Sequence, residues 1–133
     1  MSMLIDREKA LENDARGNAL ATEAAARAET QEDSDDAFQA RMLAGVSRTF
    51  ALTIPQLPGA LARVVSNAYL LCRIVDTIED EPGVSPPLKG ALCAQFIAAL
   101  GGARTAQQFS RQLLPLLSAR SSSTEHELIR QAD

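Results

Sequence analysis

The run from residue 58 to residue 81 constrains the fold more than any other part of the sequence. Pro55 precedes it, Pro58 opens it, and Pro82 and Gly83 follow it; both residue types interrupt helices. Outside one polar stripe, most side chains between residues 60 and 78 are apolar. A helix that is apolar on nearly all sides is usually buried, so this run predicts a long core helix.

One narrow polar stripe interrupts this apolar helix. Tyr69, Arg73, Asp76 and Asp80 follow one another at spacings of four, three and four residues, which places them on one helical face. Arg73 can reach Asp76 along the helix, but it is poorly placed for Asp80. Acids near a helix C-terminus meet the helix dipole unfavourably, and neighbouring carboxylates repel each other, so this cluster calls for an outside cation.

A polar stripe on an otherwise buried helix should line an internal cleft, and a magnesium ion bound there would neutralise the acids. Mg²⁺ typically takes one or two carboxylates together with substrate phosphate oxygens and water. Asp76, Glu79 and Asp80 are therefore candidate magnesium ligands. The alternative is that these acids are only the polar end of a helix, and the residues by themselves leave both interpretations open.

Proline and glycine divide the rest of the chain into further helices. The apolar period from residue 38 to 54 predicts one helix. Residues 86–101 and 103–117 predict two more, the second of them interrupted late by Pro115, and the segment 121–133 looks like the opening of another. Aromatic residues make up only 4% of the chain and few β-branched runs occur, so we predict an all-α fold.

The first 36 residues differ in composition from the rest. They form an Ala- and Glu-rich leader that ends in the acidic segment 29–36, "ETQEDSDD". We expect this leader to be partly helical or disordered, with the acidic segment as an exposed linker that caps the next helix. Residues 37–133 are then expected to form the folded part.

The charge and the residue content exclude several classes of function. The formal net charge is −4, so a basic surface for nucleic acid is not expected. Cys72 and Cys93 stand far apart and the chain has one histidine, which argues against a zinc site. No apolar run is long enough for a membrane span, and the N-terminus lacks the apolar core of a signal peptide. We therefore expect a cytoplasmic protein.

Two stretches together resemble the squalene/phytoene synthase family, the head-to-head prenyl transferases. The stretch "VSRTF" at residues 46–50 is similar to the family's Ser-Arg-x-Phe element. The stretch "AYLLCRIVDTIEDEP" at residues 68–82 is similar to its first Asp-x-x-x-Asp motif and the Tyr-x-x-x-Arg-x-x-Asp approach to it. The combination, about twenty residues apart across a proline-broken loop, is far more specific than a single acidic motif.

The resemblance implies the N-terminal portion of an isoprenoid-synthase helical bundle around a deep apolar cavity. It also implies roles at matching positions. Tyr69 would be the catalytic residue that faces the reacting carbons, Ser47, Arg48, Phe50 and Arg73 would bind substrate or cofactor, and Asp76, Glu79 and Asp80 would hold Mg²⁺. In this comparison Phe50 lines the cavity, and the two arginines contact diphosphate or the phosphates of NADPH.

The acidic motif favours one branch of the family. "DTIED" resembles the squalene type, which condenses farnesyl diphosphate to presqualene diphosphate and squalene and uses NADPH for the reduction. The alternative is a phytoene type that uses geranylgeranyl diphosphate. Prenyl products also make peripheral contact with a membrane plausible, although no basic amphipathic helix argues for it.

The resemblance covers residues 37–133 and corresponds only to the N-terminal part of the family's catalytic domain. No second Asp-rich motif is found after residue 80. We therefore expect an incomplete enzyme that is inactive as an isolated chain and needs the missing C-terminal half or a partner chain. A non-catalytic helical protein that pairs with another subunit is the alternative from a different functional class.

Overall fold

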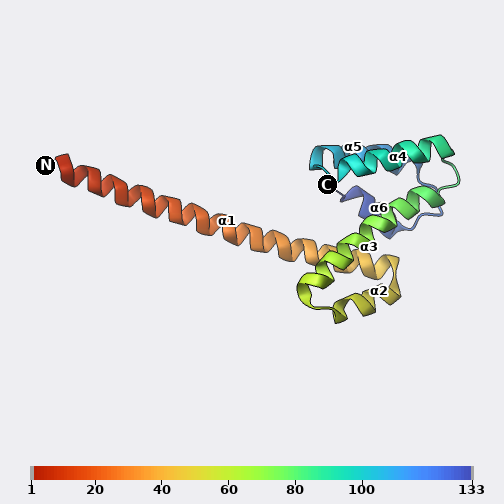
Figure 1. The fold of residues 1–133 in the computed structure, drawn as a ribbon, viewed down its shortest axis with the longest axis horizontal. Helices are drawn as coiled ribbons and strands as arrows, with labels where there is room; N and C mark the ends of the chain where they lie inside the picture. The colour runs from red at the N-terminus through yellow and green to blue at the C-terminus, as the bar shows by residue number, and fades with distance from the viewer. Residues whose placement is uncertain (1, 133) are drawn as a thin grey trace. The chain divides into compact units, whose positions relative to one another are not determined.

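The computed structural model describes the backbone of residues 2–132 and the side chains of residues 16–102 and 104–132. Within this part the regular structure is entirely helical (Figure 1), which confirms the all-α prediction. Its elements are α1 (Ser2–Val46), α2 (Arg48–Thr53), the 3-10 turn η1 (Ile54–Gln56), α3 (Gly59–Asp80), α4 (Pro86–Ala99), α5 (Ala103–Leu113), the 3-10 turn η2 (Leu114–Leu116) and α6 (Ser123–Arg130). The chain forms two compact units, residues 1–37 and 38–133.

The first unit is formed by the N-terminal part of α1. All of its described side chains, from residue 16 to residue 37, are exposed. The acidic segment 29–36 lies within α1 and does not form the expected linker that caps a new helix. Strong helix formers surround it, and Gln31 donates a hydrogen bond of 2.8 Å to Asp35 one turn further on, so the helix continues through the acids.

The second unit begins with a helix that is broken where the sequence predicted continuity. The expected helix over residues 38–54 ends at Val46, and α2 begins directly after Ser47. Ser47 has an extended backbone, and its hydroxyl accepts a hydrogen bond of 3.3 Å from the Phe50 amide. This is an N-cap, and the sequence hides it because apolar residues continue at helical spacing on both sides of the break.

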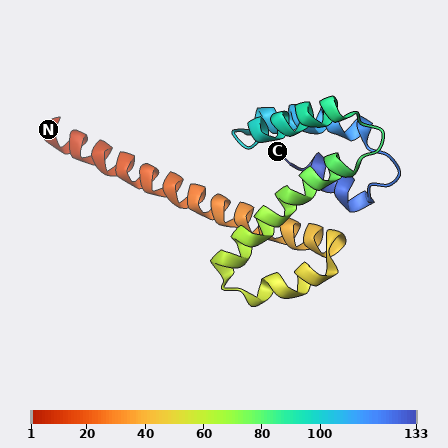
Figure 2. The same cartoon turned by 45° about the vertical axis from the view of Figure 1, so that its right-hand side comes forward.

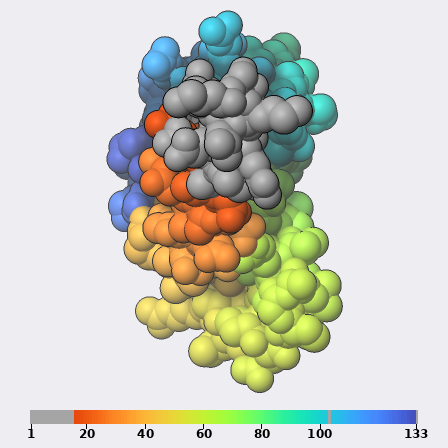
Figure 3. Space-filling view, turned by 90° about the vertical axis from the view of Figure 1, so that its left-hand side faces the viewer, coloured from red at the N-terminus to blue at the C-terminus, as the bar shows by residue number. Residues whose placement is uncertain are grey.

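Helix α3 has the predicted boundaries, but only its second half is buried. Leu70, Ile74 and Ile78 are at most 3% exposed, as expected for a core helix. Leu61 and Val64 in the first half are 48% and 65% exposed, so the prediction of burial is wrong there. In Figure 3 the atoms of α2 and the start of α3, yellow to yellow-green, lie at the molecular surface.

Helices α4 and α5 pack side by side and close the core of the second unit (Figure 2). The rings of Phe96 and Phe109 meet with their centroids 5.5 Å apart, and α5 gives way to η2 at Pro115, as the sequence predicted. The buried side chains of this core are Met42, Leu70, Ile74, Ile78, Val84, Leu92, Phe96, Phe109, Leu113, Leu128 and Ile129.

The cysteines and the helix lengths complete the description of the fold. Both Cys72 and Cys93 are free thiols, and Cys72 is exposed although its neighbours in sequence are apolar. None of the described helices combines the length and the apolar character that crossing a bilayer requires.

Candidate functional site

The polar stripe of α3 changes its environment along the helix. Tyr69 and Arg73 are half-buried, whereas Asp76, Glu79 and Asp80 are exposed. Within the described chain, the acidic end of the stripe therefore faces solvent and does not line the expected internal cleft. Exposed carboxylates can take a ligand without first losing a buried partner.

Arg73 makes its main contact outside α3. Its guanidinium donates to the carboxylate of Glu125 on α6, which lies 52 residues further along the chain. The expected pairing of Arg73 with Asp76 is therefore secondary. Burial of Arg73 opposes its charge, but the hydrogen bond and the charge of Glu125 outweigh this and raise its pKa above the usual value, with smaller contributions from Tyr69 and Asp76.

One donor of Arg73 has no acceptor among the described residues. Its Nε atom is buried and forms no hydrogen bond. Arg73 also lines a small cavity of about 80 Å³, whose other walls come from the end of α3, Glu81, the segment 120–121 and α6. A buried donor without an acceptor costs about 1–3 kcal/mol, so this Nε atom lowers the stability of the fold.

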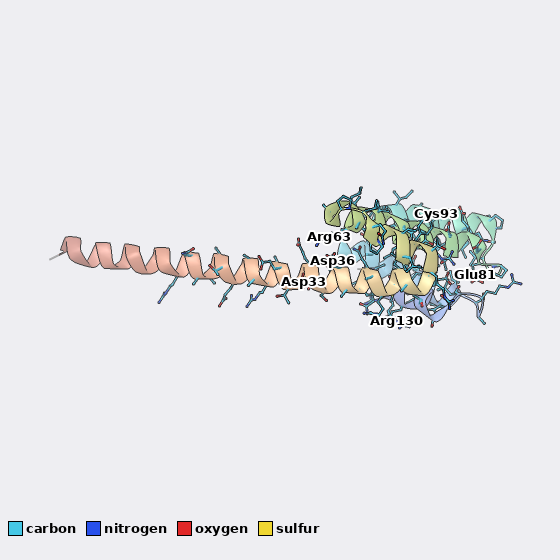
Figure 4. The ribbon with its side chains drawn as sticks, turned by 90° about the horizontal axis from the view of Figure 1, so that it is seen from below. Asp33, Asp36, Arg63, Glu81, Cys93 and Arg130 are labelled. Atoms are coloured by element: carbon cyan, nitrogen blue, oxygen red, sulfur yellow. The ribbon has the colours of Figure 1, made fainter. Side chains whose placement is uncertain are left out.

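Glu81, labelled in Figure 4, is a carboxylate that the sequence analysis missed. It directly follows α3 and is only 2% exposed. Its Oε2 accepts a hydrogen bond of 2.8 Å from the amide of Ser118, and its Oε1 accepts one of 3.3 Å from the amide of Gly83. The sequence signal for this role is a carboxylate directly before a Pro-Gly turn, because the free glycine amide of such a turn can donate a hydrogen bond to it.

The pKa of Glu81 follows from these contacts. The Ser118 amide lowers it most; burial opposes this, but the Gly83 amide and the charge of Lys89 add to the lowering. Lys89 on α4 also donates a hydrogen bond to the Glu79 carbonyl at the C-terminal end of α3. Cationic donors are favourable at that end of a helix. The end of α3 therefore has contacts with two other segments, with α4 through Lys89 and with the segment after η2 through Ser118.

The structure brings two of the predicted cavity residues together. The rings of Phe50 on α2 and Tyr69 on α3 have centroids 4.6 Å apart and are tilted by 44°. Ser47 supports this pair indirectly, since it caps the short helix that carries Phe50. Arg48 is exposed on the same helix and forms no ion pair with any residue whose side chain is described.

The three candidate magnesium ligands do not form a closed metal site. Among the described side chains, no group of three His, Cys, Asp or Glu residues is placed to hold a metal ion. Asp76 and Asp80 lie one turn apart on an exposed face of α3. Two such carboxylates fit the half-site of a magnesium ion whose other ligands are phosphate oxygens and water.

Comparison with known proteins adds independent information. The squalene/phytoene synthase family model matches residues 43–131, a range that contains all the candidate site residues. Squalene synthase of Solanum lycopersicum is 42% identical over 55 residues, 41% of this chain and 13% of its own length. Squalene synthase BSS of Botryococcus braunii is 39% identical over 64 residues, 48% and 14% of the two chains.

A third relative extends the match, and together the relatives show how much of a longer protein is covered. Squalene synthase 8 of Panax ginseng is 40% identical over 75 residues, 55% of this chain and 19% of its own length. The chain thus spans less than a fifth of the curated relatives it matches. No solved structure gives a significant match.

Proposed function

Because the chain belongs to the squalene/phytoene synthase family, we propose that it supplies one wall of a site for head-to-head condensation of two prenyl diphosphates. The observation that carries this proposal is the single face of α3 on which Tyr69, Arg73, Asp76 and Asp80 follow one another. Farnesyl diphosphate is the proposed substrate and squalene the proposed product, since the relatives above are squalene synthases.

The acidic end of the stripe would bind the diphosphate through a cation. Asp76 and Asp80, assisted by Glu79, would hold Mg²⁺, and their exposure leaves them accessible to it. Bound there, Mg²⁺ would stabilise the departing diphosphate as a Lewis acid. The Arg73 guanidinium, which is about one-third exposed, and the exposed Arg48 would bind diphosphate oxygens.

The aromatic end of the stripe would meet the reacting carbons. The rings of Tyr69 and Phe50 lie in contact with each other, and the π face of an aromatic ring attracts a cation such as the allylic intermediate. Excluding water from that position would protect the cation from hydrolysis.

A second wall is required to complete this site. Phe50 on α2 is 44% exposed, and Leu61 and Val64 on α3 are exposed still more. Large apolar side chains that stay in contact with water are typical of an interaction site when they form one patch. We propose that the C-terminal half of the catalytic domain, or a partner chain, covers these side chains and contributes the second acidic motif. The reduction to squalene would use NADPH, and the enzyme would act in the cytoplasm or at a membrane surface.

The direct test is binding of farnesyl diphosphate to the chain by calorimetry, with and without Mg²⁺. We expect binding that depends on Mg²⁺ and weakens at least about tenfold in the variant Asp76→Asn/Asp80→Asn. The control variant Glu23→Gln/Glu29→Gln removes the same charge from exposed positions of α1 and should bind as the parent chain does. Equal binding by both variants, or binding that ignores Mg²⁺, would reject the proposed site.

A further inference from the structure

We propose that Glu125 is a positioning residue for Arg73. Its carboxylate holds the guanidinium away from the acids of α3, so that Asp76 and Asp80 stay free for a cation. The role of these two acids rests on the function proposed above. The position of Arg73 can be tested separately from that function.

Arg73 has two possible carboxylate partners on different elements. Asp76 lies three residues further along the same helix, but it is exposed, and ion pairs in water are weak. Glu125 comes from α6, and its side chain is only 8% exposed. Because charges attract more strongly where water is excluded, Arg73 pairs with Glu125, and the carboxylate of Asp76 forms no hydrogen bond or ion pair within the described chain.

The orientation of the Glu125 carboxylate is fixed because each of its two oxygens accepts a hydrogen bond from a different donor. Oε2 accepts a hydrogen bond of 2.7 Å from the Ser122 amide, and the Ser122 hydroxyl accepts one of 3.2 Å from the Glu125 amide. This capping box leaves Oε1 to accept from Arg73. Turning the carboxylate away from Arg73 would break the helix cap, so the two contacts stabilise the same rotamer.

The helix that carries Glu125 is itself anchored in the core. Leu128 and Ile129 are at most 5% exposed, and the buried Ser110 hydroxyl donates a hydrogen bond of 2.6 Å to the Ile129 carbonyl. Glu125 therefore presents a negative charge to Arg73 from a rigid position. Without that charge, the guanidinium can turn toward the acids of α3 and compete there with the cation.

The decisive variant is Glu125→Gln, because glutamine also serves at this position of a capping box. The substitution removes the charge and keeps the helix cap. We expect the dissociation constant for Mn²⁺, measured by electron paramagnetic resonance as a probe for Mg²⁺, to rise about tenfold. We also expect the ¹⁵N NMR signal of the Arg73 Nε–H group to shift and its hydrogen exchange to accelerate.

The control variants separate this role from a purely structural one. Glu127→Gln removes the same charge from the same helix but breaks the exposed pair with Arg41, so neither readout should change. Ser122→Ala weakens the cap but leaves the ion pair. It should lower the melting temperature without changing the Mn²⁺ affinity. In an Arg73→Gln background, Glu125→Gln should have no further effect on Mn²⁺.

Two results would overturn the proposal. One is an unchanged Arg73 signal or Mn²⁺ affinity in Glu125→Gln, and the other is an equal loss of Mn²⁺ affinity when Arg73 is already replaced. If the parent chain binds no Mn²⁺, the metal site of the proposed function is rejected. The NMR signal of Arg73 then decides by itself whether Glu125 positions it.

Discussion

Glu81→Gln should destabilise the second unit by about 2 kcal/mol at neutral pH. The parent carboxylate accepts from two backbone amides, Ser118 at 2.8 Å and Gly83 at 3.3 Å. Hydrogen bonds to a charged group contribute about 1.5–3 kcal/mol. Glutamine keeps one carbonyl oxygen but turns an NH₂ group toward the other amide, so one partly buried donor loses its acceptor.

The same argument gives a pH dependence with a definite sign. The pKa of Glu81 is lower in the folded chain than its ordinary value, so the unfolded chain binds the proton more readily. The stabilisation is therefore fully present above the ordinary glutamate pKa and is lost as the pH falls through the lowered, folded value. The difference between parent and Glu81→Gln should shrink accordingly as the solution is acidified.

The assay is urea unfolding followed by the fluorescence of Tyr69, the one tyrosine in a chain without tryptophan. Hydrogen exchange at the Ser118 amide gives a local check, because this amide loses its best acceptor. Glu79→Gln is the matched control, since Glu79 is exposed and its loss should cost less than about 0.5 kcal/mol. Equal effects of the two variants, or a Glu81→Gln effect independent of pH, would refute the reasoning.

Two further predictions concern packing. In Gly45→Ala the new Cβ would lie 2.5 Å from the Cγ2 and Oγ1 atoms and 3.0 Å from the Cβ atom of Thr124. Overpacking of about 1–3 kcal/mol should therefore exceed the gain in helix propensity of about 1 kcal/mol, whereas Gly90→Ala, with nothing within 4 Å, should raise the free energy of unfolding. Phe109→Ala should lower that free energy by about 3–5 kcal/mol because the ring is 2% exposed, while Ile97→Ala, at 69% exposure, should change it by less than about 0.5 kcal/mol. Urea unfolding measures all four variants, and a Gly45→Ala chain at least as stable as the parent would contradict the first prediction.

The candidate site could be predicted from the sequence where it depends on a single helix. The stripe from Tyr69 to Asp80 follows from residue spacing, and α3 has the boundaries that its flanking prolines predicted. The break at Ser47 was missed because an N-cap preserves the apolar period on both sides. The magnesium, NADPH and substrate roles stay predictions, as does the division of the chain at residue 36.

The sequence by itself determined the local features of this protein. Helix propensity, proline and glycine positions and the spacing of side chains act over a few residues, so they define the all-α fold and the stripe of α3. The tertiary structure decided the partners. Arg73 pairs with Glu125, 52 residues away, and Glu81 accepts from Ser118, 37 residues away. Which charged and polar groups meet in a buried region depends on how the helices pack together. Local spacing in the sequence carries no information about that packing.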